Sequence, residues 1–430
     1  MTAALEAPAR EASAPPPARG QRRLRLGLVV LAGFLVLSLV RVTTGASDLT
    51  SGGTAAGALR LTVPIGLAAL GGLWAERAGV VNIGLEGMMI LGTWSGAFVG
   101  YQHGPWAAVA AGALGGALGG LVHAVATVTF GVDHVVSGVA INILAAGLVR
   151  YLSVTAYANV SGGGPTQSPN VAGHIGTASM PVLAGGRIFG WSSPDALAAL
   201  EGHHWYALSD AAGLLGGLLR GVSWFTVLAA ALVPLSAVLL WRTPFGLRLR
   251  SVGESPAAAE SLGVGVYRMK YAGVVISGAL AGLAGAFLVT VASDHYQQGQ
   301  TGGRGYIGLA ALIFGNWLPG ALALGSGLFG YSDAVQLRQA SAVHALLLFA
   351  GLLLVAYAGY ALARRRKAAA LGAAVAAAAA LLTFALTSQV APELTSATPY
   401  VVTLLVLALA AQRLRPPAAD GLPFRRGERT

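Results

Sequence analysis

Long apolar stretches, separated by short polar or basic ones, set the pattern of this chain. The runs are about as long as the ~17–25 residues that a helix needs to cross a ~30 Å hydrocarbon layer, and they do not alternate in polarity as barrel strands do. We therefore predict an all-α fold, a polytopic transmembrane helical bundle. The predicted spans cover residues 26–40, 57–74, 79–101, 105–130, 135–157, 223–241, 271–293, 343–363, 368–388 and 398–411.

The segment 305–335 departs from this pattern. Two apolar pieces flank the sequence NWLPG (316–320), where proline removes a helical hydrogen bond and glycine tolerates a bend. If the two pieces formed one span, the basic cluster 364–367 would fall outside, against the preference of basic residues for the inner side. We predict two short elements, a broken or re-entrant helix, and roughly 10–12 membrane elements in all.

Composition and charge agree with a membrane protein. The chain is 55% hydrophobic and 10% charged, whereas soluble domains hold about 25% charged residues. The net charge of +11 comes from basic clusters beside the apolar runs, which are topology signals rather than a surface for nucleic acid. With the N-terminus inside, the inner loops and tails collect about 20 of the 27 Lys and Arg residues. We expect a multi-pass protein of the plasma or inner membrane with a cytoplasmic N-terminus.

The apolar runs define a single transmembrane domain, 26–411. Residues 1–25, rich in Ala, Pro and Arg, are expected to form a disordered cytoplasmic tail, and residues 412–430 a second cytoplasmic tail. The external loop 158–222, rich in Gly, Pro, Ser and His, is predicted to hold a short helix near 195–220. This loop is either simply solvated or a docking face for an external partner.

The segment 242–270 is a charged island. Seven of its 29 residues ionise, whereas the apolar runs on either side carry almost no charge. A segment this polar between two spans must lie in water, and the charge rule places it in the cytoplasm.

Polar side chains within the predicted spans are candidates for a transport pathway, because they are costly in a bilayer. Asn82 and Glu86 are four residues apart and would share one helix face, and Asn142 lies in the span 135–157. Asn316 and Trp317 lie at the predicted helix break, where freed backbone groups must face protein or water. The alternative for each is a satisfied hydrogen bond between helices.

Other residues receive a structural interpretation. Asp333 and Gln336 are expected near a solvated outer boundary, and the histidines, such as His123 and His344, lack the spacing of metal ligands, so no metal site is predicted. The chain has no cysteine and therefore no thiolate site. Glycines at four-residue spacing predict close helix contacts at Gly112, Gly116 and Gly120, and at Gly278 and Gly282.

Motifs for catalysis are absent from the sequence. It contains no G-x-x-x-x-G-K-[ST] phosphate loop, no nucleophile elbow and no H-E-x-x-H helix. We therefore predict that the chain is not an enzyme and does not hydrolyse ATP by that route.

Four long stretches carry a family resemblance. They are ERAGVVNIGLEGMM (76–89), TPFGLRLRSVGESPAAAESLGV (243–264), SGALAGLAGAF (277–287) and GYIGLAALIFGNWLPGALALGSGLFGYSDAVQLR (305–338). Together they resemble a permease subunit of bacterial ABC importers, in the branch that carries ribose-like sugars and nucleosides, and they are most similar to its nucleoside-type members. The chain is longer between 336 and 400 than is usual in that family.

The resemblance implies partners and a mechanism. Such a permease pairs with a second permease, identical or paralogous, receives substrate from an external binding protein and is driven by cytoplasmic ATPases through alternating access. ATP and Mg²⁺ would sit on the ATPase, and no cofactor is expected in this chain. The resemblance places the coupling helix at 254–263, with contact residues Glu254, Ala258, Glu260 and Gly263.

Two other functions remain open from the sequence. A secondary transporter could couple protons through Glu86 or Asp333, although the charged island argues against it. A membrane scaffold without transport is the other alternative. Within the importer interpretation, a sugar of the ribose type is the alternative to a nucleoside.

Overall fold

The computed structural model describes residues 19–188, 191–203, 205–338, 340–388, 390, 398 and 414–425, and these are mainly helical. Eight of the helices in these residues are long and apolar enough to cross a membrane. The predicted polytopic helical bundle is therefore confirmed. The elements are α1 (Arg19–Thr44), η1 (Ser47–Leu49), α2 (Gly52–Arg77), α3 (Leu85–His103), α4 (Pro105–Ala124), η2 (Val125–Thr129), α5 (His134–Tyr157), β1 (Thr177–Ala178), β2 (Arg187–Ile188), β3 (Trp191–Ser192), α6 (Ala196–Gly202), α7 (Leu208–Leu219), β4 (Val222–Ser223), α8 (Trp224–Arg242), α9 (Pro244–Glu254), α10 (Pro256–Ser261), α11 (Val266–Phe287), η3 (Leu288–Ala292), α12 (Arg304–Phe314), α13 (Pro319–Gln336), α14 (Ala340–Ala363) and α15 (Lys367–Leu386).

The helices fall into two compact units. One contains α1, α15 and α14 from Ala345 onward, and the other contains the elements from η1 to α13 together with residues 414–425. Helix α1 begins at Arg19, within the stretch predicted to be a disordered tail, whereas residues 1–18 lie outside the described part. The predicted spans 343–363 and 368–388 correspond to α14 and α15, and the predicted span 398–411 lies outside the described residues except for residue 398.

Short polar side chains cap the N-termini of several helices of the second unit. Ser51 accepts a hydrogen bond from the backbone N–H of residue 54 at the start of α2, and Ser223 does the same for α8. Asp133 caps the N-terminus of α5 in this way, and Thr243 caps that of α9, where a proline follows at the first helical position. Such caps satisfy the free N–H groups of a helix N-terminus and fix where each helix begins.

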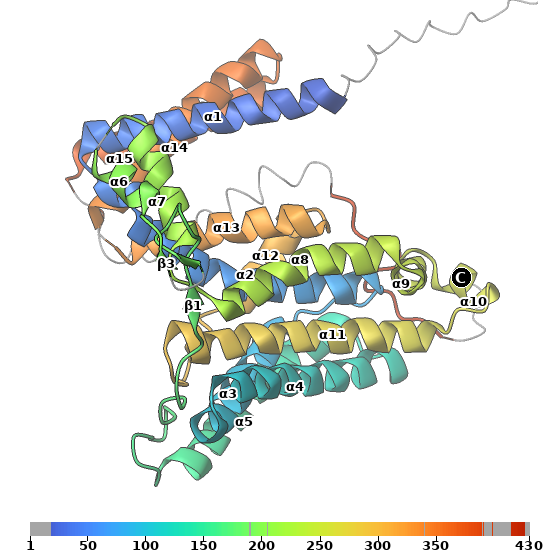
Figure 1. Cartoon of the computed structure of the whole chain (residues 1–430). Coiled ribbons are helices and arrows are strands. Elements are labelled where there is room, and N and C mark those ends of the chain that lie inside the picture. The colour runs from blue at the N-terminus through green and yellow to red at the C-terminus, as the bar shows by residue number, and fades with distance from the viewer. Residues whose placement is uncertain are drawn as a thin grey trace, which may run out of the picture. The chain divides into compact units, whose positions relative to one another are not determined.

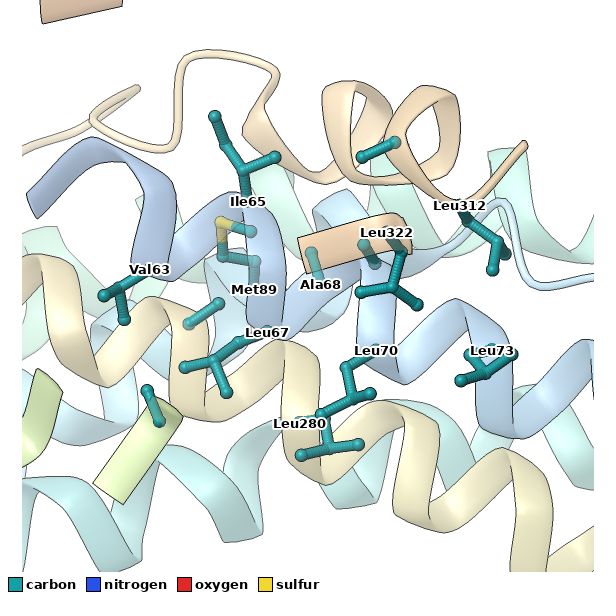
Figure 2. Packing of buried hydrophobic residues seen from close by; sticks show 14 of the residues in the cluster. Val63, Ile65, Leu67, Ala68, Leu70, Leu73, Met89, Leu280, Leu312 and Leu322 are labelled. Carbon is teal, nitrogen blue, oxygen red and sulfur yellow. The ribbon is translucent and has the colours of Figure 1, made fainter. Parts of the chain in front are cut away.

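Helix α2 lies at the centre of the second unit. Its residues Val63, Leu67, Leu70 and Leu73 pack into one buried apolar cluster with residues of α11, α12 and α13, as Figure 2 shows. Figure 1 shows α2, α8 and α11 side by side between two ends of this unit. We call the end that carries β1 and residues 158–222 the loop face, and the end that carries α9 and α10 the α9 face.

Glycines bring α4 and α11 into contact. A Cβ atom built on Gly116 would lie 2.2 Å from the carbonyl oxygen of Gly278, and one on Gly282 would lie equally close to the carbonyl oxygen of Gly112. No side chain fits at such distances. The close helix contact predicted from the four-residue glycine spacing is therefore confirmed.

The broken helix predicted at 305–335 is present as α12 and α13. They form a hairpin, because Arg304 at the start of α12 pairs with Asp333 near the end of α13 at 3.0 Å. The turn between them places Asn316 and Trp317 in the left-handed region, with φ of 49° and 54°. Asp333 is buried and paired, so the expectation of a solvated outer position for it is wrong.

Two predicted boundaries differ from the structure. The span expected at 79–101 becomes helical only at Leu85, because residues 78–84 are turn or extended chain. The charged island 242–270 contains two helices, α9 and α10, and α11 already begins at Val266, five residues before the span predicted at 271–293.

The loop-face segment 158–222 has more structure than one short helix. Two small antiparallel pairs form, β1 with β4 and β2 with β3. Helices α6 and α7 replace the single helix expected near 195–220, and α7 packs closely against α2, since a Cβ on Gly217 would lie 2.1 Å from the carbonyl oxygen of Gly52.

Candidate functional site

The segment 78–84 returns into the interior of the bundle after α2 has reached the α9 face. Asn82 donates from its side-chain amide to the hydroxyl of Ser277 at 2.8 Å, and Ser277 lies halfway along α11. Gly71 of α2 lies at the same depth, because a Cβ built there would be 2.7 Å from the Ser277 carbonyl oxygen. Helix α3 therefore starts in the middle of the bundle.

Side chains from four positions satisfy the backbone of this buried segment. Non-helical backbone is tolerated at membrane depth only where protein or water covers its polar groups. The contacts are His123 Nε2 to Val81 O (3.1 Å), Val81 N to His134 Nδ1 (3.3 Å), Asn142 Nδ2 to Ile83 O (3.0 Å) and Lys270 Nζ to Gly79 O (3.1 Å). His123 thus has a structural role, and among the described residues no three His, Asp or Glu side chains cluster as metal ligands do.

The carboxylate of Glu86 caps the N-terminus of α12. It lies in the first turn of α3, is only 7% exposed, and accepts the backbone N–H of Gly303 at 3.0 Å and that of Gly305 at 2.7 Å. The free N–H groups and the dipole of a helix N-terminus favour a negative charge. Two helices that both begin inside the bundle, α3 and α12, therefore meet at one carboxylate.

Asn142 extends this junction to α5. Its Oδ1 accepts the backbone N–H of Gly87 at 2.7 Å, and its Nδ2 donates to Ile83 O and to the hydroxyl of Tyr306 at 2.9 Å. The structure thus brings Glu86 and Asn142 together, with Tyr306 as a member that sequence reasoning missed.

Asn82 is not on a common helix face with Glu86, because it precedes α3. That expectation from the four-residue spacing is wrong. Asn82 is fully buried, and its Oδ1 has no hydrogen-bond partner among the described residues.

A cavity of about 150 Å³ continues the junction toward the loop face. Ile90 and Thr93 of α3 line it, four and seven residues after Glu86, and Ala146 and Val149 of α5 line it at the same offsets from Asn142. Residues at these offsets share a helix face. The remaining wall is the non-helical segment 296–301, with three glutamines and a threonine. Exposed backbone of this kind cannot face lipid, so this wall faces water or another protein.

Asn316 and Trp317 lie at the other end of α12, on the α9 face. Trp317 Nε1 donates to the carboxylate of Glu76, and Arg77 donates to Trp317 O at 2.8 Å. Asn316 Oδ1 accepts the backbone N–H of Arg415 at 2.8 Å. The structure therefore separates these two residues from Glu86 and Asn142.

Helices α9 and α10 form the polar surface of the α9 face. Of the four predicted coupling residues, Ala258 and Gly263 are exposed, Glu260 is half-buried, and Glu254 lies 3.8 Å from the guanidinium of Arg77. An apolar side chain, Leu262, is 83% exposed beside them. Exposed apolar groups rimmed by polar ones are typical of protein contacts.

A buried charged cluster under α9 was missed by the sequence analysis. It comprises Glu76, Arg77 and Lys270 together with Asp420 from the C-terminal segment. Burial raises the pKa of Asp420 to about 7, although the nearby Lys270 ammonium lowers it. The only signal in the sequence was the Glu76-Arg77 pair that opens the first family stretch.

Comparison with known proteins places the chain among membrane permeases. Residues 54–358 match the family described as branched-chain amino acid transport system / permease component. The guanosine ABC transporter permease protein NupQ of Bacillus subtilis (strain 168) is 38% identical over 288 residues, which cover 64% of this chain and 78% of that protein. The nucleoside ABC transporter permease protein NupC of Lactococcus lactis subsp. cremoris (strain MG1363) is 34% identical over 280 residues, 63% of this chain and 77% of that protein.

A third relative is a protein of Haloferax volcanii that is provisionally named glucose ABC transporter permease protein TsgC13. It is 32% identical over 292 residues, 67% of this chain and 79% of that protein. No solved structure matches the chain significantly.

Proposed function

The chain belongs to the branched-chain amino acid transport system / permease component family, and on this premise we propose that it is the membrane-spanning subunit of an ATP-driven importer of nucleosides. Two of the relatives described above are named as guanosine or nucleoside permeases, which favours a nucleoside over a sugar. The chain is thus a transport component rather than an enzyme.

The cavity above Glu86 and Asn142 is the proposed substrate route. Its walls come from α3, α5 and the segment 296–301. We take the hydrogen-bonded junction of α3, α5 and α12 as its floor, because Glu86 and Asn142 lie one helical turn from the lining residues Ile90 and Ala146. This junction is the single observation that carries the assignment of the route. Half-helices whose N-termini meet inside the bundle are a recurring way to build a transport site. In alternating access, movement of α12 away from α3 opens the floor toward the α9 face.

The two faces suit different partners. We assign the α9 face to the cytoplasm, where α9 and α10 dock an ATPase that holds ATP and Mg²⁺, and the N-terminus to the same side. The loop face then meets the external binding protein. On this face, a cavity of about 260 Å³ lies between α2 and the segment 158–222, and Arg60 of α2 is one of the residues that line it. A second permease, the same or paralogous, covers the exposed wall 296–301.

A proton-coupled secondary transporter has less support. Glu86 accepts two backbone N–H groups, and Asp333 pairs with Arg304. The oxygens of both carboxylates are thus occupied by donors within the protein, and these contacts explain the two side chains without proton coupling.

Reconstitution in proteoliposomes tests the proposal. The chain is combined with its ATPase, second permease and binding protein, and uptake of labelled guanosine is compared with that of ribose and glucose. We expect guanosine uptake that requires ATP. Uptake driven by a proton gradient in this chain alone would refute the proposal, and the absence of any flux in the complete system would favour the scaffold alternative.

A further inference from the structure

The C-terminal segment 414–425, which we call the strap, lies against the α9 face (Figure 1, red). It is joined to α9 by backbone contacts. The N–H of Ala419 donates to Gly253 O at 2.9 Å, and the N–H of Ala418 donates to the Glu254 carboxylate at 3.2 Å. Both acceptors belong to the last turn of α9, directly before α10.

The strap is also fixed to α11. Lys270 Nζ donates to Leu422 O at 3.4 Å, and the ring of Phe424 meets that of Tyr267 with 5.8 Å between centroids. Phe424 further packs against a small buried cluster from α9, α10 and α11, formed by Val252, Ala259 and Val266. Ala419 is buried as well.

A third set of contacts reaches the turn between α12 and α13. Arg415 donates its N–H to Asn316, and the half-buried Asp420 hydrogen-bonds with Glu76, which also accepts from Trp317. Left-handed backbone at a non-glycine residue is unfavourable and persists where the surroundings hold it. The strap and the end of α2 therefore hold this turn in its conformation from two sides.

These contacts place the strap between the docking helices and the substrate route. Helix α12 has 11 residues and is about 16 Å long. Its C-terminal end leads into the turn that the strap contacts at Asn316, and its N-terminal end contacts Glu86 at the junction below the cavity. A shift of the turn moves the N-terminus of α12 with it, because a helix of this length is stiff.

We propose that the strap is the mechanical link that carries motion of α9 and α10 to α12, and so to the floor of the substrate route. The inference rests on the proposed function, in which an ATPase moves α9 and α10. It assigns a positioning role to residues 414–425, and Asn316 and Trp317 serve as the point of attachment rather than as the pathway lining.

The test uses the full complex in proteoliposomes. One variant ends after residue 413, a second carries Phe424→Ala, and the matched control carries Leu422→Ala, whose exposed side chain makes no contact that the strap needs. A reporter cysteine at Gln298 on the cavity wall is the only thiol of this chain, because the chain has no cysteine of its own, and labelling is read on this subunit alone. ATPase co-purification, ATP-driven uptake and ATP-dependent labelling of the reporter are measured.

We expect the control to behave as the unmodified chain. Without the strap, or with Phe424→Ala, the ATPase remains bound but the reporter no longer responds to ATP, and uptake falls within the roughly 5- to 150-fold range typical of couplings between sites. Normal reporter response and uptake in both variants would overturn the link. An unmodified complex without ATP-driven uptake would instead overturn the proposed function.

Cross-linking the strap to α9 gives an independent measurement that does not depend on truncation. Cysteines at Glu254 and Ala418, both exposed, are joined by a short bifunctional thiol reagent. A link that stays attached throughout the cycle predicts that uptake by this double-cysteine variant is the same before and after cross-linking. Loss of uptake that cleavage of the cross-link restores would show that the strap must release, and would overturn the proposal.

Discussion

Replacement of the Glu86 carboxylate by an amide, Glu86→Gln, tests the junction at the floor of the cavity. The side chain keeps its shape, but only one oxygen remains to accept the two N–H groups of Gly303 and Gly305. In the unmodified protein their nitrogens lie 3.0 and 2.7 Å from the two carboxylate oxygens. One bond to a charged acceptor is lost, worth about 1.5–3 kcal/mol, and the favourable charge at the α12 N-terminus is lost with it. The expected loss is about 2–4 kcal/mol at the α3–α12 junction.

Two assays read this change. Thermal unfolding in detergent is expected to shift down by a few degrees, and ATP-driven guanosine uptake to fall about tenfold or more. Glu201→Gln is the matched control, because Glu201 also accepts a backbone N–H, that of Gly52 at 3.1 Å, but on the loop face away from α12. Uptake and unfolding of Glu86→Gln that equal those of the control would refute the role of Glu86.

Three further predictions follow from other contacts. Gly116→Val forces α4 away from α11 and should cost more than about 2 kcal/mol, measured as loss of the folded protein on heating in detergent. Leu262→Asp should lower ATPase co-purification about tenfold without altering insertion, because it removes an exposed apolar contact. Since the pKa of Asp420 is raised to about 7 from 3.8, the folded strap binds more protons than the free one between about pH 4 and 7, so its attachment weakens as pH rises through that window. Labelling of a cysteine at the buried Ala419 should therefore increase from pH 5 to 7, and Asp420→Asn should abolish the increase.

Each of these predictions has a matched control in the chain. Gly147→Ala adds a methyl group where nothing lies within 4 Å, so it should leave stability unchanged. Leu183→Asp changes an exposed apolar residue on the loop face and should not affect the ATPase. A cysteine at the exposed Ala418 corrects for the pH dependence of the thiol reaction itself. Equal responses in a variant and its control would contradict the corresponding prediction.

The helical class, most spans and the broken helix were predictable from the sequence, because each depends on local properties. Apolar length specifies a span, and the proline at 319 with the basic cluster 364–367 was enough to divide α12 from α13. The start of α3 was not predictable in this way. Residues 78–84 are apolar enough to continue a helix, and only distant side chains such as His123 and Asn142 make their extended path possible.

Two residues of the candidate site were named from the sequence, but the way they are arranged was not predicted. Glu86 and Asn142 were chosen because polar groups in a bilayer are costly, and this argument names a residue without naming its partner. Tyr306 was missed because a tyrosine near a helix start gives no signal of its own. Asp420 was missed for a different reason, since it meets Glu76 across 344 positions of the chain and lies in a tail that composition marks as solvated.

Two glutamates of one sequence stretch hold both ends of α12. Glu86 accepts the N–H groups at its N-terminus, and Glu76 accepts the indole N–H of Trp317 just beyond its C-terminus. Residues 78–84 run back into the bundle between these glutamates, so the stretch 76–89 contacts α12 at its N-terminus and the turn after its C-terminus. If α12 moves during transport, one of the two glutamate contacts must yield first. In the proposed mechanism, motion from the α9 face reaches the Glu76 end, which the strap also contacts, and the Glu86 end is the contact that opens the route.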